Sequence, residues 1–283
     1  MYNFKIVNID TDSIMVCKPD GSIFSDEEQD VLLQELNDMF PEHINWDDDG
    51  YYRSVVVIKA KNYILLPHDD DKLKIKGSAT KDSKKEPALK EMMANMVDAM
   101  VYNRLEEIPL IYKKYVQEAM NVTDIMRWST KKTISDKVLA GRNPKADVRK
   151  QELDVWKAIQ HEDDIQEGNK IYLYPVILGE EITPGGVSEK TGKPLKDKVK
   201  VVTGLKLAKY WDNDHNVEHL ISRVYATVKI FKNVLDMEQF IDYSKKKNIP
   251  LLEDLKNEVI DLKLNTTNIE MDEDDDGTDE DQE

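Results

Sequence analysis

The chain has 283 residues, of which 40% are hydrophobic and 34% are charged, and 56 acidic residues outnumber 40 basic ones to give a formal net charge of −16. This length supplies one large or two modest domains with a core. The single Cys17 excludes an intramolecular disulfide and a cysteine zinc cluster. Because no apolar run approaches about 18 residues and no signal-peptide pattern follows Met1, we expect a cytoplasmic protein that is not attached to a membrane.

The negative charge is concentrated near the C-terminus. Residues 270–283 carry ten acids and no bases, which leaves 46 acids against 40 bases elsewhere. Two segments of this mildly acidic remainder are basic: residues 53–90 hold ten bases and five acids, and residues 121–150 hold eight and three. Basic segments of this kind are either solvated surfaces or binding surfaces for a nucleic-acid phosphate backbone.

The first predicted element is a β-hairpin. Strand-like runs at Phe4–Val7 and Ile14–Cys17 frame an acidic turn, Asp10–Ser13. Residues i and i+2 of a strand share a face, so Asp10 and Asp12 would place two carboxylates in one small volume. A divalent cation such as Mg²⁺ or Mn²⁺ would relieve their repulsion. The alternative is ordinary turn chemistry.

A helix is predicted next, over about residues 26–39. Ser25 is a suitable N-cap, and Glu28 completes a capping box. Apolar residues at helical spacing would form its buried face, at Val31, Leu32, Leu36 and Met39.

Two basic strands are predicted after a polar loop. In the first, which runs from Val55 to Leu66, alternation would place Lys59, Lys61 and Tyr63 on one face, as suits a nucleic-acid groove. Solvated strand lysines are the alternative.

The second basic strand carries Lys72, Lys74 and Lys76 in alternation and leads to Gly77-Ser78. Small side chains there would let a phosphate approach the backbone amides.

Helical patterns dominate from Pro87, a natural first-turn residue. Apolar spacing predicts a long amphipathic helix that reaches about Leu105, with its methionines in the core. Another helix should follow Pro109, and shorter helical and strand pieces should run through residues 128–174.

The remaining pattern is also mainly helical. Residues 183–198, rich in Gly, Pro and Lys, predict an exposed loop or hairpin. Helical spacing returns over residues 217–235 and 251–264. The acidic residues 267–283 predict a disordered tail.

Three of these features stand in the order of motifs in a known enzyme family. Asp10-Thr11-Asp12-Ser13 resembles the third palm motif of family B DNA polymerases of the large-bacteriophage type. Lys61-Asn62-Tyr63 resembles their Lys-x-Tyr motif, and Lys74-Ile75-Lys76-Gly77 resembles the Lys-x-Lys-Gly stretch between palm and thumb. The resemblance covers about residues 1–245, and the joint order of its motifs carries it.

Further motifs and departures complete the comparison with the family. Met126–Lys132 resembles the thumb's Ile-Thr-Lys segment, and Glu167–Ile171 resembles the Gly-Asp-x-Ile that precedes a thumb strand. Asn8-Ile9 replaces the usual Tyr-Gly before the acidic motif. The family's first palm motif, the helix whose Lys meets the incoming triphosphate, and the exonuclease domain have no counterpart in the sequence.

The resemblance implies an α+β fold. Residues 1–82 would be the C-terminal palm portion, made of a β-hairpin, a helix and antiparallel strands. Residues 83–266 would be a mostly helical thumb, followed by the disordered acidic tail.

The resemblance also implies a function. The chain would be a subunit or fragment of a DNA-directed DNA polymerase with a two-metal site for Mg²⁺ or Mn²⁺. Its partners would be primer-template DNA, a dNTP, and a second subunit that carries the remaining palm, the fingers and the exonuclease. A processivity factor is a further candidate partner, and a phage protein would work in the host cytoplasm.

Residue roles follow from the same resemblance. Asp12 would bridge both metals, Asp10 would tune the site beside it, and Lys61 and Tyr63 would hold the primer end. Further contacts with the DNA are assigned to Lys59, Lys74, Lys76, Gly77, Arg127, Lys131 and Lys132.

Two other functions stay open. One is a DNA-binding or processivity subunit in which the predicted metal-binding aspartates are inactive. The other is a zinc peptidase, because His215-Asn216-Val217-Glu218-His219 fits the inverted His-x-x-Glu-His pattern, although breaker-rich Asp212–Asp214 precedes it. Residues 272–283 also fit an EF-hand pattern formally, but Asp279 occupies a position that expects an apolar residue.

Overall fold

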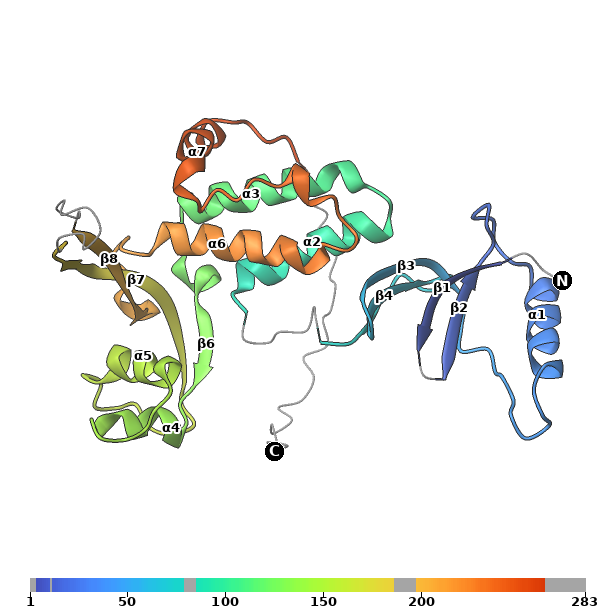
Figure 1. Cartoon of the computed structure of the whole chain (residues 1–283), viewed down its shortest axis with the longest axis horizontal. Coiled ribbons are helices and arrows are strands. Elements are labelled where there is room, and N and C mark those ends of the chain that lie inside the picture. Colours follow the sequence, from blue (N-terminus) through green and yellow to red (C-terminus); the bar gives the residue numbers. More distant parts are fainter. Residues whose placement is uncertain (1–3, 11, 79–84, 186–196, 263–283) are drawn as a thin grey trace, which may run out of the picture. The chain divides into compact units, whose positions relative to one another are not determined.

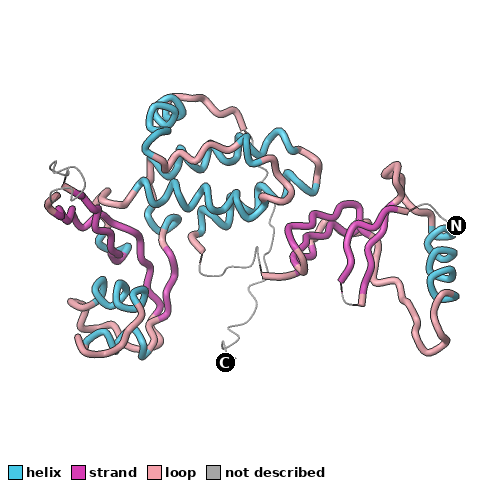
Figure 2. Tube along the Cα trace, viewed as in Figure 1, coloured by secondary structure: helices cyan, strands magenta, loops and turns pink. Residues whose placement is uncertain are grey.

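The computed structural model describes residues 4–10, 12–78, 85–185 and 197–262. These residues form a mixed α+β structure with seven α-helices and three small antiparallel sheets (Figure 1). Figure 2 shows how helices and strands alternate along the chain. The chain divides into two compact units, of which unit 1 holds the described residues before 79 and unit 2 those after 84. No helix within the described ranges is long and apolar enough to cross a membrane.

Unit 1 begins with the predicted hairpin, which is confirmed. β1 (Lys5–Asp10) and β2 (Ser13–Cys17) pair antiparallel, and Asp10 lies opposite Ser13. No third strand joins this sheet within the described residues, and none of the residues in its two strands is buried. Cys17, at the end of β2, is half-buried.

The helix α1 (Asp26–Asp38) confirms the predicted capping box. Ser25 Oγ accepts a hydrogen bond from the Glu28 amide at 3.3 Å, and the Glu28 carboxylate accepts one from the Ser25 amide at 2.8 Å. The same carboxylate pairs with Lys18 Nζ at 2.6 Å. This ion pair ties the first turn of α1 to the residue that follows β2.

Three strands make the second sheet of unit 1. β3 (Tyr52–Lys59), β4 (Asn62–Pro67) and β5 (Lys74–Lys76) lie in the order β3-β4-β5, all antiparallel. The core of unit 1 includes five buried side chains of this sheet, at Val56, Ile58, Ile64, Leu65 and Leu66. Burial of these side chains fixes the register of the strands.

The single strand predicted from Val55 to Leu66 is wrong, because the chain reverses at Ala60-Lys61. Lys61 adopts a left-handed backbone conformation (φ 59°), and the Asn62 side chain closes the turn by donating from Nδ2 to the Ala60 carbonyl at 2.9 Å. Lys59 therefore ends one strand, and Lys61 lies in the turn. The predicted common face of Lys59, Lys61 and Tyr63 does not exist.

Three helices of unit 2 surround a core rich in methionine: α2 (Pro87–Val101), α3 (Ile108–Met120) and α6 (Val217–Val228). The prediction that the α2 methionines are core residues is confirmed, since Met92, Met93 and Met96 have no exposed surface.

The ends of the unit 2 helices differ from the prediction. α2 stops at Val101, before left-handed Asn103, and Leu105 is exposed rather than buried. α6 gives way to a 3-10 turn after Val228, and α7 (Ile249–Lys256) ends well before residue 264.

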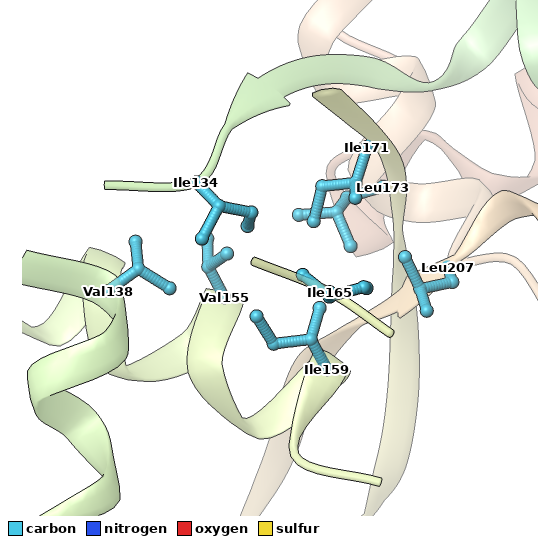
Figure 3. Close-up of a cluster of buried hydrophobic side chains, with 8 residues drawn as sticks. All are labelled: Ile134, Val138, Val155, Ile159, Ile165, Ile171, Leu173 and Leu207. Atoms are coloured by element: carbon cyan, nitrogen blue, oxygen red, sulfur yellow. The ribbon is translucent and has the colours of Figure 1, made fainter. Parts of the chain in front are cut away.

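The sheet of unit 2 is packed by two helices. β6 (Thr130–Thr133), β7 (Lys170–Thr183) and β8 (Lys198–Leu207) are antiparallel, and α4 (Asp136–Leu139) and α5 (Lys150–Ile159) adjoin them. Figure 3 shows the side chains that join these elements, Ile134, Val138, Val155, Ile159, Ile165, Ile171, Leu173 and Leu207. The strand predicted to follow residues 167–171 is β7, which begins at Lys170. Thr183 and Lys198 pair at the ends of β7 and β8, but most of the loop or hairpin predicted between them, residues 186–196, lies outside the described ranges.

A polar network joins this sheet to the segment before α6. Tyr174 Oη and Lys206 Nζ each donate a hydrogen bond to the Asp214 carboxylate, both at 2.7 Å. Burial alone would raise the pKa of Asp214, but these hydrogen bonds and those from nearby backbone amides outweigh it and lower the pKa from 3.8 to about 2.

The low pKa of Asp214 predicts an acid-sensitive contribution to stability. Because the folded carboxylate binds its proton less tightly than the unfolded one, its contribution is complete above the ordinary pKa of 3.8 and is lost as the pH falls toward 2. Thermal unfolding should show that Asp214→Asn is less stable than the wild type at pH 5 and that this difference shrinks toward pH 2.5. A difference that stays constant with pH would contradict the assignment.

Candidate functional site

The candidate site is built around the tip of the β1-β2 hairpin. Asp10 is the last residue of β1 and its side chain is 26% exposed, whereas Asp12 lies in the turn and is exposed. Thr11 lies outside the described residues. The prediction that the two aspartates share one face of a strand is therefore wrong.

The turn between β3 and β4 lies beside this tip. Lys61 Nζ is 3.9 Å from Asp10 Oδ1, although the two residues are separated by fifty positions in the sequence. The pKa of the Tyr63 phenol is raised, first by burial and then by the negative charges of Asp10, Asp49 and Asp12. One lysine and one tyrosine thus lie close to the predicted carboxylates.

β5 adds a second lysine to this surface. Lys76 lies directly opposite Tyr63 in the antiparallel pair of β4 and β5, and Lys74 lies opposite Leu65. The Lys74 ammonium also lies over the Tyr52 ring, 5.4 Å from its centroid. Both predicted lysines therefore lie on the strand next to Tyr63.

Gly77 follows β5 and packs against the turn that carries Lys61. It has a positive φ of 86°, and a Cβ at this position would lie 2.3 Å from the Lys61 carbonyl oxygen and 2.5 Å from Asn62 Oδ1. Only glycine allows this close approach without a backbone shift. Packing against the turn therefore requires a glycine here, whereas the approach of a phosphate to its backbone stays a prediction.

Sequence reasoning missed three residues of this region. Asn62 is buried and shapes the turn, while Tyr52 and Asp49 lie near Tyr63. The asparagine carried a usable signal, since Asn between two strand-like runs often marks a turn. Asp49 carried none, because it belongs to a polar loop whose path only the fold determines.

The candidate site contains two carboxylates that could be ligands of a divalent cation. Asp10 and Asp12 offer the hard oxygen ligands that Mg²⁺ and Mn²⁺ prefer. Within the part of the chain that the structure describes, however, no three His, Cys, Asp or Glu side chains gather closely enough to hold a metal ion. At this tip the described residues thus offer two carboxylates as possible ligands.

The other predicted contacts with DNA are Lys59 in unit 1 and three residues of unit 2. Lys59 is exposed at the end of β3. In unit 2, the Arg127 guanidinium donates to Glu118 at 2.9 Å and to Glu91 at 2.7 Å, and these hydrogen bonds raise its pKa. Arg127 thus links α2 to α3. Its guanidinium, which was expected to contact a phosphate, is paired with these two carboxylates.

Lys131 and Lys132 lie on opposite faces of β6. Lys131 is exposed, whereas Lys132 is half-buried and near enough to the buried Glu152 to help lower the pKa of that carboxyl group. The largest cause of the lowered Glu152 pKa is a hydrogen bond from its own backbone amide, and Arg149 adds to it at 2.5 Å. Of the two predicted lysines, only Lys131 is fully presented to solvent.

The alternative zinc pattern lacks its required helix face. α6 begins at Val217, and the Asn216 side chain caps it by accepting from the His219 amide at 3.0 Å. His215 therefore precedes the helix, where its Nδ1 accepts a hydrogen bond from Trp211 Nε1 at 3.3 Å. The formal EF-hand pattern of residues 272–283 lies outside the described ranges.

The raised pKa of Tyr63 provides a direct test of this arrangement. Asp10→Asn removes a negative charge that disfavours the phenolate, so the pKa of Tyr63 should fall while burial keeps it above its ordinary value. Titration of ¹³C-labelled tyrosine by NMR, with Tyr63→Phe for assignment, measures this change. Asp30→Asn on α1 is the control, and equal pKa values in all three proteins would show that Asp10 does not face Tyr63.

Comparison with protein-family models and with curated proteins found no match to this chain.

Proposed function

We propose that this chain is part of a family B DNA polymerase and supplies one carboxylate corner of its two-metal nucleotidyl-transfer site. In this proposal Asp12 is the bridging ligand, Asp10 lies beside it, and Lys61 and Tyr63 hold the primer end. A thumb formed by unit 2 grips the primer-template duplex. The chain works with a companion chain that carries the other carboxylate motif, the fingers and the exonuclease.

The proximity of two motifs is the observation that carries the proposal. The acidic turn and the Lys-x-Tyr motif were identified separately in the sequence, and the 3.9 Å between Asp10 and Lys61 brings them together. The same arrangement places the charges of Asp10 and Asp12 near enough to Tyr63 to raise the pKa of its phenol, after the larger effect of burial. A carboxylate pair beside a lysine and a tyrosine offers oxygen ligands for a cation and donors for a phosphate edge.

The Lys74–Gly77 motif also supports the proposal by its position. Lys76 lies across from Tyr63, and Gly77 contacts the Lys61 turn, so both add to the same surface. A row of lysines beside two aspartates suits a site where a nucleic-acid backbone meets a metal-bound phosphate. Plain turn chemistry at Asp10–Ser13 would require none of these neighbours.

Primer extension tests the proposed function. The chain alone should incorporate no nucleotide, and the complex with its companion should extend a primer in the presence of Mg²⁺. Extension by the isolated chain, or a complex that binds a primer-template but never extends it, would contradict the proposal. The second result would favour the alternative, a DNA-binding subunit without catalysis.

DNA binding by this chain should depend on specific lysines. Lys61→Ala and Lys131→Ala should each weaken binding and reduce the slope of log affinity against log salt by about 0.9, the value for one lost phosphate contact. Lys132→Ala should change the slope less, because Lys132 faces Glu152. Fluorescence anisotropy from 50 to 300 mM salt measures these slopes, with exposed Lys247→Ala as the control. A slope that no variant changes would show that neither unit binds phosphate through these residues.

A further inference from the structure

A second surface of unit 1 lies away from the proposed chemistry, on α1 and the residues that flank it. The predicted apolar face of this helix is only partly covered, since Leu32 is its only buried residue in the described structure. Large apolar side chains here are exposed by 39% to 69%, namely Ile23, Val31, Met39, Phe40 and Ile44. We call these five residues the α1 surface.

The sequence that carries the α1 surface is acidic, although Lys18, just before it, pairs with Glu28. Residues 19–52 contain eleven aspartates and glutamates and no lysine or arginine. Even the last turn of α1, where a basic side chain would be favourable, contains no base. Exposed apolar side chains within so acidic a stretch, whose acids we call the acidic rim, are unusual for a surface that faces only water.

The neighbouring hairpin also indicates that unit 1 is incompletely covered. A two-stranded hairpin is marginally stable alone and normally needs further strands or a packed face. No residue of β1 or β2 is buried, and Ile6 and Ile9 are 48% and 65% exposed. Both elements that carry these apolar side chains therefore lack a covering layer within the described chain.

The negative charge near the α1 surface favours one kind of binding partner over the others. A nucleic acid or an anionic membrane would be repelled by eleven acids. A second copy packed about a two-fold axis would bring the same acidic rims together, because such an interface uses one surface twice. A protein surface with an apolar centre and a lysine- and arginine-rich rim fits both properties.

We infer that the α1 surface is the docking site for the companion chain, which presents an apolar patch surrounded by basic residues. This inference rests on the proposed function for the identity of the companion. The apolar centre supplies the buried area, and the acidic rim steers and orients the two chains.

Matched variants on two helices test the inference. Asp38→Lys on α1 and Asp254→Lys on α7 each replace an exposed aspartate in a last helical turn, so both are compatible with the helix dipole. Val31→Gln with Met39→Gln removes apolar surface from α1 without adding charge, and Leu251→Gln on α7 is its control. Circular dichroism checks that every variant is folded, and Met39→Leu keeps the apolar contact. Calorimetry measures affinity for the purified companion chain at 50 and 300 mM salt.

The expected results are specific. Both α1 variants should weaken binding at least about tenfold, Asp38→Lys more strongly at low salt, whereas Met39→Leu and the α7 controls should stay within about twofold. Wild-type affinity in the α1 variants, or equal losses in the α7 controls, would overturn the inference. So would a wild-type homodimer that Val31→Gln with Met39→Gln dissociates, since the occupant would then be a second copy.

Primer extension separates this inference from the proposed function. If the α1 variants lose the companion but the wild-type complex never extends a primer, the docking surface stands and the polymerase proposal falls. If the complex extends primers and the α1 variants bind normally, only the docking surface falls.

Discussion

Asp12→Asn is expected to lower nucleotide incorporation by the assembled complex by about 100- to 1,000-fold. A bound divalent cation contributes several kcal/mol of charge stabilisation in the transition state, and each 1.4 kcal/mol is about tenfold in rate. The amide of asparagine keeps the size of the side chain but carries no charge to hold such a cation. Single-turnover primer extension at saturating dNTP measures this loss.

Two controls make the Asp12 result interpretable. Primer-template affinity without nucleotide should change less than the rate, because Asp12 is exposed at a turn and supports no described helix or strand by packing. Asp164→Asn, an exposed aspartate between α5 and β7, should leave incorporation unchanged. Normal incorporation by Asp12→Asn would remove the metal role and favour the DNA-binding alternative.

Met96→Ala is expected to destabilise unit 2 by about 2–5 kcal/mol, which corresponds to a melting temperature lower by roughly 5–15 °C. Met96 lies in the middle of α2 and has no exposed surface. Its truncation removes apolar contacts and leaves a cavity that rigid neighbouring helices fill only in part. Differential scanning calorimetry measures the transition of unit 2.

The matched control for Met96 is another methionine of unit 2. Met126 is 42% exposed, so Met126→Ala should cost within about 0.5 kcal/mol, as expected for a surface substitution. Equal effects of the two substitutions would contradict the core of α2, α3 and α6 described above.

The sequence predicted the elements that local signals determine. The capping box fixed the start of α1, Pro87 fixed the start of α2, and alternation fixed the first hairpin. The prediction failed for turns and helix ends that depend on tertiary packing. The turn at Ala60-Lys61 has no glycine to mark it, since Lys61 itself takes the left-handed conformation. Helix ends were placed too late because apolar spacing continues past the last helical hydrogen bond.

The candidate site was predictable in its members but not in its arrangement. Asp10, Lys61 and Tyr63 could be chosen by residue type, yet the assumed strand geometry for each pair was wrong. Arg127 could not be distinguished from a phosphate ligand, because its partners Glu91 and Glu118 come from distant positions. Asp49 was unpredictable for the same reason. The local sequence shows which side chains could bind a metal or a phosphate, and the fold determines which of them lie close together.

The close contact of Gly77 with the Lys61 carbonyl has a mechanical consequence. A side chain at position 77 would meet the carbonyl oxygen of Lys61 and the side chain of Asn62, so it would displace the turn rather than point into solvent. Because Lys61 lies beside Asp10, a substitution of Gly77 would also change the distance between this lysine and the carboxylate.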